Sequence, residues 1–363
     1  MSSILVKFAN KLRPCQSTEV LQVDSSADRL FLTSLLNTIL HTNSQYFLFY
    51  KNERILENLI SIIEKCNLCT EDVLDIDYID EKDIGADSSM HCSDVVRSFA
   101  LFQDKLFYLT YEGKIFEVDQ DQLVTKNEIY MKNNSRTVGI FVGRELYGYA
   151  SDSIFKVDGG GFLEVPDEIR CCSAYKKHIA VGCANSIYLV NADLNTIEKI
   201  AGKPALGASV RSIQMNSDIV AWIQGHGSIC IYERSTKSIK VHKTPGGLTA
   251  LKIHDGNLVA LSSCHLIIKI SLESGKIDEY INTFRYSNAL ELKGNAVIHA
   301  SQKYVAVERI NNGVCNGTSD IILAVHGQIN SIILIGSSLY VAHDNAISRV
   351  SLERKTTNSD ATS

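Results

Sequence analysis

The feature that most constrains the fold is an internal repeat of about 40 residues that occupies most of the chain. Each cycle places an apolar strand, a turn and a second apolar strand in succession, as in residues 104–109 followed by residues 113–119. A repeat of this length and strand rhythm is typical of a β-propeller. Seven equivalent positions align at steps of 40, 33, 40, 39, 39 and 42 residues: Leu106, Leu146, Ile179, Ile219, Leu258, Val297 and Leu339. The sequence therefore predicts a seven-bladed propeller over residues 94–352.

The repeat has the period of WD40 propellers but few of their signature residues. The Trp-Asp pair that ends a WD40 repeat is replaced by pairs such as Val118-Asp119 and Val157-Asp158. The single tryptophan, Trp222, falls on a different strand. We interpret the repeat as WD40-like, with an unrelated propeller as the alternative, and the lost signatures leave the blade boundaries open.

Residues 1–79 precede the repeat and are predicted to form a separate small domain. Alternating or continuous apolar runs indicate strands, and apolar residues at helical spacing after Ser25-Ser26, a predicted N-cap, indicate a helix. The expected order is strands at 4–8 and 19–23, a helix through residue 40, a strand at 46–50, a short helix at 59–63 and a strand at 73–78. This order is that of a ubiquitin-like β-grasp. Residues 80–93 are predicted to be an acidic linker and residues 353–363 a polar tail.

Acidic residues are concentrated in the first quarter of the chain. Residues 1–90 hold 8 Lys and Arg against 14 Asp and Glu, a balance of −6, whereas the remainder holds 28 against 27, or +1. Lys82 is the only cation among eight carboxylates near the end of the head: Glu71, Asp72, Asp75, Asp77, Asp80, Glu81, Asp83 and Asp87. Such a segment repels nucleic acid phosphates and favours a partner that is cationic or carries a metal.

Several classes of function find little support in the sequence. No apolar run approaches the ~20 residues of a membrane span, so we expect no membrane partner, and the ten cysteines are expected to be thiols. Cys66 and Cys69 have the spacing of half a zinc site, but no second pair lies near them in the head. No motif places a Ser, Cys or His for nucleophilic catalysis, and the Asp-boxes of propeller enzymes are not visible. We expect no enzyme and no cofactor of its own; direct RNA contact stays open.

The head and the repeat together resemble a known family. Residues 67–79, which read Asn-Leu-Cys-Thr-Glu-Asp-Val-Leu-Asp-Ile-Asp-Tyr-Ile, resemble the NLE (Notchless-like) ubiquitin-like domain of the WD-repeat ribosome-biogenesis proteins of the PeBoW complex. The resemblance is strong over residues 4–79 and rests on architecture after that. The related Notchless proteins continue with a more basic segment and usually have eight blades.

The resemblance implies a scaffold in assembly of the large (60S) ribosomal subunit. Proteins of this family use the head to engage the MIDAS domain of the AAA+ ATPase midasin, where a carboxylate completes the coordination of Mg²⁺. The family's acidic residue aligns with Glu71, seven positions before Tyr78, and Asp72 is the fallback ligand. The propeller would bind the block-of-proliferation protein, itself joined to pescadillo, on the pre-60S particle. The implied location is the nucleus, in the nucleolus and nucleoplasm.

Two other function classes stay open beside this one. A Notchless-type pre-60S factor would share the head and differ in the propeller. A ubiquitin-linked WD-repeat adaptor would recruit a ligase or the proteasome through the head and would not need Glu71.

Overall fold

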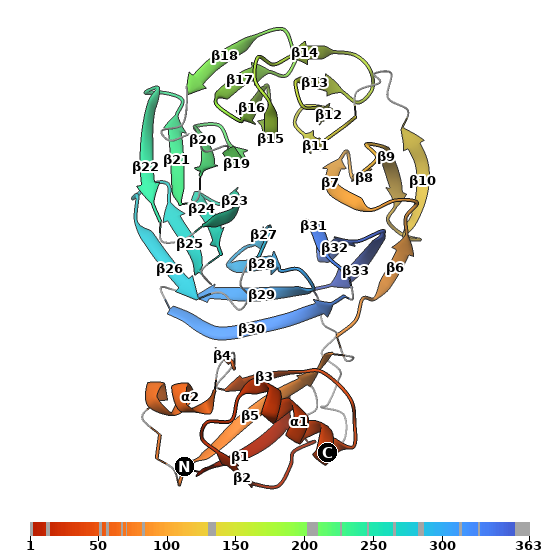
Figure 1. The fold of residues 1–363 in the computed structure, drawn as a ribbon. Coiled ribbons are helices and arrows are strands. Elements are labelled where there is room, and N and C mark those ends of the chain that lie inside the picture. Colours follow the sequence, from red (N-terminus) through yellow and green to blue (C-terminus); the bar gives the residue numbers. More distant parts are fainter. Residues whose placement is uncertain are drawn as a thin grey trace, which may run out of the picture. The chain divides into compact units, whose positions relative to one another are not determined.

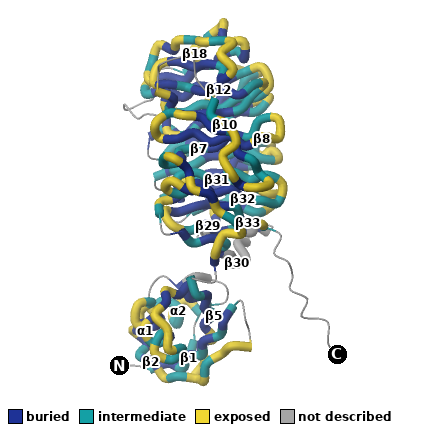
Figure 2. The backbone as a smooth tube through the Cα atoms, turned by 90° about the vertical axis from the view of Figure 1, so that its right-hand side faces the viewer, coloured by how far each residue is buried: buried dark blue, intermediate teal, exposed yellow. Residues whose placement is uncertain are grey.

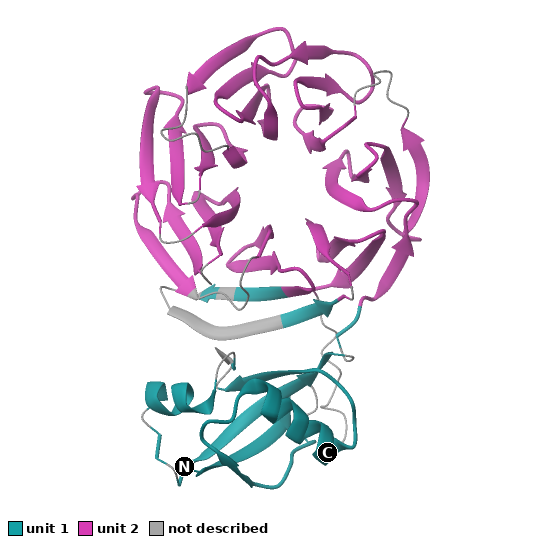
Figure 3. Ribbon diagram, viewed as in Figure 1, with its two compact units in different colours: residues 1–85, 306–324 teal, residues 86–305, 325–363 magenta. Residues whose placement is uncertain are grey.

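The computed structural model describes the chain except residues 1–2, 12–14, 51–52, 56–57, 67, 70, 82–83, 130–135, 202–209, 226, 245–246, 264–265, 282–286, 312–313, 326 and 353–363. The predicted tail therefore lies outside the described residues. The chain divides into two compact units, residues 1–85 with 306–324 (unit 1) and residues 86–305 with 325–363 (unit 2), coloured in Figure 3. No helix among the described residues has the length and apolar character needed to cross a membrane.

Residues 3–80 form a five-stranded mixed sheet with two helices. The strands are β1 (Ser3–Asn10), β2 (Leu21–Asp24), β3 (Tyr46–Tyr50), β4 (Glu53–Arg54) and β5 (Val73–Asp80), and the helices are α1 (Arg29–Leu40) and α2 (Leu59–Cys66). The sheet order is β2-β1-β5-β3-β4 (Figure 1). The central strands β1 and β5 run parallel, whereas β1–β2, β3–β4 and β3–β5 are antiparallel.

Alternation along the central strands produces the core of this sheet. Every second residue of β1 is buried, including Val6 and Phe8, and β5 buries Leu74 and Ile76 in the same way. Leu32 and Leu36 of α1 pack into the same cluster, so the helix covers the apolar face of the sheet. The strands and helices predicted for residues 4–78 are present, and the structure adds the short strand β4.

The predicted N-cap of the first helix is wrong. The helix begins at Arg29 because the carboxylate of Asp28 accepts a hydrogen bond from the Phe31 amide at 2.8 Å. Asp24 accepts hydrogen bonds from both the amide and the hydroxyl of Ser26, at 2.8 and 2.6 Å. These contacts hold the predicted cap position in a turn, which moves the start of the helix along the chain.

Seven four-stranded sheets follow, and each described pairing within them is antiparallel. The first three sheets contain β7 (Val96–Phe102), β8 (Lys105–Thr110), β9 (Ile115–Asp119) and β10 (Val124–Ile129); β11 (Gly139–Val142), β12 (Leu146–Tyr149), β13 (Ser153–Lys156) and β14 (Phe162–Glu164); β15 (Ile169–Tyr175), β16 (His178–Cys183), β17 (Ile187–Asn191) and β18 (Ile197–Ala201).

The fourth to seventh sheets contain β19 (Val210–Met215), β20 (Ile219–Gln224), β21 (Ser228–Glu233) and β22 (Ser238–Lys243); β23 (Leu248–His254), β24 (Asn257–Ser262), β25 (Leu266–Ser271) and β26 (Ile277–Ile281); β27 (Ala289–Lys293), β28 (Ala296–Ala300), β29 (Tyr304–Asn311) and β30 (Val314–Ala324); β31 (Ile329–Ile335), β32 (Ser338–His343), β33 (Ala346–Ser351) and β6 (Ser88–His91).

The first strands of the seven sheets form a ring. The first strands of successive sheets contact one another, and β31 of the last sheet contacts β7 of the first (Figure 1). Each of the seven aligned sequence positions falls on, or at the start of, the second strand of one sheet. Most second strands are buried along their length, whereas the turns between strands are largely exposed (Figure 2).

The first strand of unit 2 in the sequence completes the last sheet. Strand β6 pairs antiparallel with β33, with His91 opposite Ala346 and Ser88 opposite Arg349. Residues 88–91 of the predicted linker 80–93 therefore belong to the ring. The sequence does not predict this strand, because only one of its four residues, Met90, is buried and no apolar pattern results. Met90 packs in a cluster with Tyr108 and Ile347, which joins the first and last sheets.

Aspartate side chains tie the loops that precede several sheets to turns within those sheets. Asp94 accepts a hydrogen bond from the Glu112 amide, and Asp167 accepts one from the Asn185 amide, both at 2.8 Å. In the last sheet the roles reverse, because Asp344 in the turn accepts from the Gln328 amide at 3.0 Å. These bonds satisfy one backbone donor in each of three sheets without using a tryptophan.

We expect Met90→Ala to weaken ring closure. Removing a buried methionine side chain leaves a cavity between the first and last sheets, and the free energy of unfolding should fall by about 2 kcal/mol. Urea unfolding followed by tryptophan fluorescence measures this, since Trp222 in β20 is the only tryptophan and lies in unit 2. The exposed neighbour His91 provides the control, and His91→Ala should change the unfolding free energy by less than about 0.5 kcal/mol.

Candidate functional site

The predicted ligand Glu71 lies in a short turn between α2 and β5. Glu71 and Asp72 are both exposed, and β5 begins at the next residue, Val73. Among the described residues, neither a hydrogen bond nor an ion pair involves the Glu71 side chain. Thr70, which precedes it, lies outside the described residues. The turn therefore presents one carboxylate to the surroundings.

Asp72, the fallback ligand, has a structural role in the same turn. Its Oδ2 accepts a hydrogen bond from the Cys69 amide at 2.8 Å, and its own amide donates to the Cys69 carbonyl at 3.1 Å. The two bonds close the turn on itself. Because one Asp72 oxygen is occupied in this way, Glu71 is the better placed of the two to bind an external cation.

Strand β5 gives this turn a firm base. It lies at the centre of the sheet, paired with β1 on one side and β3 on the other. Pairing with β1 starts at Val73, opposite Leu5. A side chain two residues from the start of a central strand is held in position better than one on a long loop, which favours specific ligation.

The acidic face of β5 is less uniform than the sequence indicated. Lys7 of β1 lies opposite Asp75 in the parallel ladder, and both belong to the face away from the core. Asp87 is not part of this field, because its carboxylate accepts a hydrogen bond from the Ser351 amide in unit 2. Lys82 and Asp83 lie outside the described residues. In the turn itself, Glu71 and Asp72 remain as two adjacent exposed carboxylates.

The cysteines of the sequence analysis lie at separate places. Cys66 ends α2 and Cys69 is exposed in the turn, both as free thiols. Across the described part of the chain, no group of three or more His, Cys, Asp or Glu side chains is arranged to hold a metal ion. Cys171 and Cys172 lie on β15, the first strand of the third sheet, and burial raises the pKa of both thiols. A raised pKa makes a thiol a poor nucleophile.

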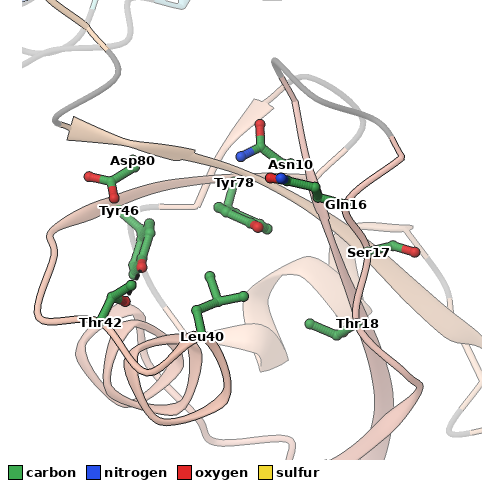
Figure 4. Close-up of a pocket in the computed structure, with 9 residues that line it drawn as sticks. All are labelled: Asn10, Gln16, Ser17, Thr18, Leu40, Thr42, Tyr46, Tyr78 and Asp80. Carbon is green, nitrogen blue, oxygen red and sulfur yellow. Dashed lines mark hydrogen bonds between the residues drawn. The ribbon is translucent and has the colours of Figure 1, made fainter.

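A hollow of about 350 Å³ lies at the other end of β5 from Glu71 (Figure 4). The rings of Tyr46 and Tyr78 meet there edge to face at 5.5 Å, and the Tyr46 hydroxyl shares a hydrogen bond with Thr42 at 2.5 Å. The remaining lining residues, mostly polar, are Asn10, Gln16, Ser17, Thr18, Leu40 and Asp80. Small-molecule sites are mainly apolar, so this polar hollow does not have the usual character of one.

Comparison with solved structures finds WD-repeat propellers. The structure of U3-55K superimposes with a TM-score of 0.60 at 13% identity, covering 74% of this chain and 100% of that one. A chain of the mitotic checkpoint complex gives 0.61 at 9% identity, covering 74% and 92%. The computationally designed protein Ika8 gives 0.55 at 12% identity, covering 72% and 97%. No protein-family model matches the sequence, and no curated protein is significantly similar to it.

At these identities the likeness shows the fold alone. The protein is mainly β, and its ring of antiparallel sheets has a WD-repeat-like β-propeller fold. The turn that carries Glu71 lies within residues 3–80, which contribute no strand to the seven sheets of the ring.

We expect Asp72→Ala to loosen the turn without unfolding the head. The Cys69 amide would lose a charge-assisted hydrogen bond worth about 1 kcal/mol at an exposed position, so its exchange with solvent should accelerate roughly fivefold. Hydrogen exchange of peptides spanning residues 66–73 measures the change. Glu71→Ala is the matched control, and equal acceleration in both variants would contradict the role assigned to Asp72.

Proposed function

We propose that the protein is a non-catalytic scaffold with a ubiquitin-like head and a seven-bladed WD40-like β-propeller. The order β2-β1-β5-β3-β4, with α1 on one face, is the arrangement of ubiquitin-like β-grasp domains and supports the first part. Seven four-stranded sheets in the described chain, closed by β6, support the second.

The observation that carries the proposal furthest is the placement of Glu71. An exposed carboxylate beside a central strand is suited to complete the coordination of a metal ion held by another protein. Mg²⁺ takes oxygen ligands in octahedral geometry and commonly leaves positions for a partner's carboxylate. We propose that Glu71 supplies this ligand in trans to the Mg²⁺ of the midasin MIDAS domain, while the chain holds no metal of its own.

The biological setting follows from the resemblance of residues 67–79 to the NLE family. In that setting the protein is an assembly factor of the pre-60S particle in the nucleolus and nucleoplasm. Its propeller would bind the block-of-proliferation protein and, through it, pescadillo. The seven sheets favour this family over a Notchless-type factor, which usually has eight blades.

We expect Glu71→Gln to abolish binding to the isolated midasin MIDAS domain in the presence of Mg²⁺. The amide keeps the size of the side chain but removes the charge. Loss of groups that only orient a metal ligand already costs 10–100-fold in affinity, so loss of the ligand itself should cost about 100-fold or more. Isothermal titration with purified partners measures the change.

Asp75→Asn is the matched control, because it removes a carboxylate from the adjoining strand β5, away from the turn. It should change the affinity no more than about threefold, as expected for an exposed charge. Undiminished binding by Glu71→Gln would refute the ligation. Co-purification of a ubiquitin ligase or the proteasome, with no effect of Glu71→Gln, would favour the ubiquitin-linked adaptor instead.

Removing the head should spare the complex of the propeller with the block-of-proliferation protein, provided that the cut leaves β6 intact. Asp87 belongs to the closing sheet, since its amide donates to the Arg349 carbonyl at 2.9 Å. Deletion of residues 1–86 should therefore preserve binding in a pull-down. Deletion of residues 1–91 removes β6 and should lose both binding and the native fluorescence of Trp222. If the shorter deletion kept a folded ring but lost the partner, the proposed division of labour would be wrong.

A further inference from the structure

Five of the seven first strands in the ring carry a β-bulge at an equivalent position near their start. The pairing with the second strand shifts between Val96 and Ser98, and in the same way in four other sheets, so that one extra residue is accommodated. A bulge bends the strand and re-aims a side chain. The five extra residues are Arg97, Arg170, Arg211, Thr249 and Asn330.

All five residues lie on one face of the ring. In an antiparallel sheet the first strand begins at the edge where the second strand turns into the third. The Tyr111 amide in such a turn donates to the Val95 carbonyl at 2.9 Å, which places the start of β7 beside it. The bulges therefore surround the ring at the level of these turns.

The bulge residues of the first, third and fourth sheets are all arginines, Arg97, Arg170 and Arg211. The second sheet begins instead with Gly139, and the ring of Tyr149 fills the space of its missing Cβ, with Cε1 only 2.3 Å from that point. The Tyr149 hydroxyl donates to the Arg170 carbonyl of the third sheet at 3.3 Å. The tyrosine thus bridges the gap between the arginines of the first and third sheets.

A fourth arginine and an exposed aromatic ring extend this surface. The guanidinium of Arg97 lies 5.3 Å from the centre of the Tyr111 ring, and Nε of Arg136 donates to the Tyr111 carbonyl at 2.9 Å. Tyr111 is 43% exposed, which is unusual for so large a ring. We call the set Arg97, Tyr111, Arg136, Tyr149, Arg170 and Arg211 the arginine arc.

Four acidic side chains on the same rim, Asp94, Glu112, Asp167 and Glu168, stand against the four arginines of the arc and Lys114, which leaves one positive charge in excess. Asp94 and Asp167 are engaged with backbone amides, and Glu112 pairs with Lys114 at 3.0 Å. Glu168 pairs with the arc through Nη2 of Arg170 at 2.7 Å. This contact already places a carboxylate against an arc guanidinium.

We propose that the arginine arc binds a short acidic segment of a partner protein. The planar guanidinium matches a carboxylate with paired hydrogen bonds, and the exposed tyrosine offers an apolar surface for the peptide backbone or an aromatic residue. A nucleic acid fits less well. Its evenly spaced phosphates would approach Asp94, Glu112 and Asp167 on the same rim, whereas a peptide can direct one or two carboxylates to the arginines alone.

This site is separate from Glu71, lies within unit 2 and does not depend on the function proposed for the head. Its test uses the full chain and two fluorescent probes, a decapeptide of glutamate and a decamer of uridylate, followed by anisotropy at low salt. The variants are Arg97→Ala and Arg170→Ala. The matched control is Arg144→Ala, because Arg144 is exposed like Arg170 but lies in the turn between β11 and β12, on the opposite face.

The glutamate peptide should bind saturably, and each arc variant should weaken it three- to tenfold, the range expected for partly exposed charge-assisted pairs. Arg144→Ala should leave its affinity unchanged. Absence of saturable peptide binding, or an equal loss in the Arg144 variant, would overturn the proposal. Tighter binding of the uridylate decamer, lost in the same arc variants, would overturn it in favour of single-stranded nucleic acid.

Discussion

The pairing of β6 with β33 is the contact on which the ring depends. It joins residues 255 positions apart, as His91 lies opposite Ala346, so it closes nearly the whole of unit 2. The entropy cost of closing such a loop grows only with the logarithm of its length, and a short ladder with good packing can meet it. Met90 supplies the packing. The Arg349 guanidinium adds a hydrogen bond to the Gln120 carbonyl at 2.7 Å, which joins the last sheet to the first.

Closure also explains why the repeat tolerates so much variation in its polar signatures. In a closed ring each sheet lies between two neighbouring sheets. The first strand of each sheet contacts the first strands of these neighbours and is not left as a free edge. The loops then need only local hydrogen bonds that satisfy their backbone amides. Asp94, Asp167 and Asp344 supply these in different sheets, and in the sixth sheet a buried hydrogen bond of 2.9 Å between Ser287 and His299 provides a polar contact of another kind. One architecture is thus stabilised by several unrelated polar solutions.

The parts of the fold that were predictable are those with a strong local pattern. Strands β20 and β24 are mainly apolar runs buried on both faces, β1 alternates strictly, and β5 alternates over its first six residues. The missed features depend on partners far away in the chain. Strand β6 has one buried residue and is recognisable only from its pairing with β33. The helix starts after Asp28 because Asp24 holds Ser26 in a turn. The position of Lys7 opposite Asp75 follows only from the parallel pairing of β1 with β5. For the candidate site, the sequence indicated Glu71 and Asp72 but could not separate their roles, because the bond from Cys69 to Asp72 is a property of the folded turn.

The spatial arrangement of charged residues also depends on the fold and was not predictable from the sequence. Counting charged residues along the sequence gives a net charge of −6 for residues 1–90 and +1 for the remainder. The near-neutral total for the remainder does not show that four of its arginines lie on one rim of the ring. These four arginines are separated by 34 to 41 residues, close to one repeat, so no sequence window contains two of the bulge positions. A repeat that returns each bulge to the same rim converts scattered single charges into a shared surface. Under the two proposals made above, the chain has two surfaces of opposite preference, a carboxylate on the head for a metal or cation and an arginine-rich rim for carboxylates. Because the two surfaces would attract different chemistry, two partners would not compete for one surface, which is what the proposed scaffold role requires.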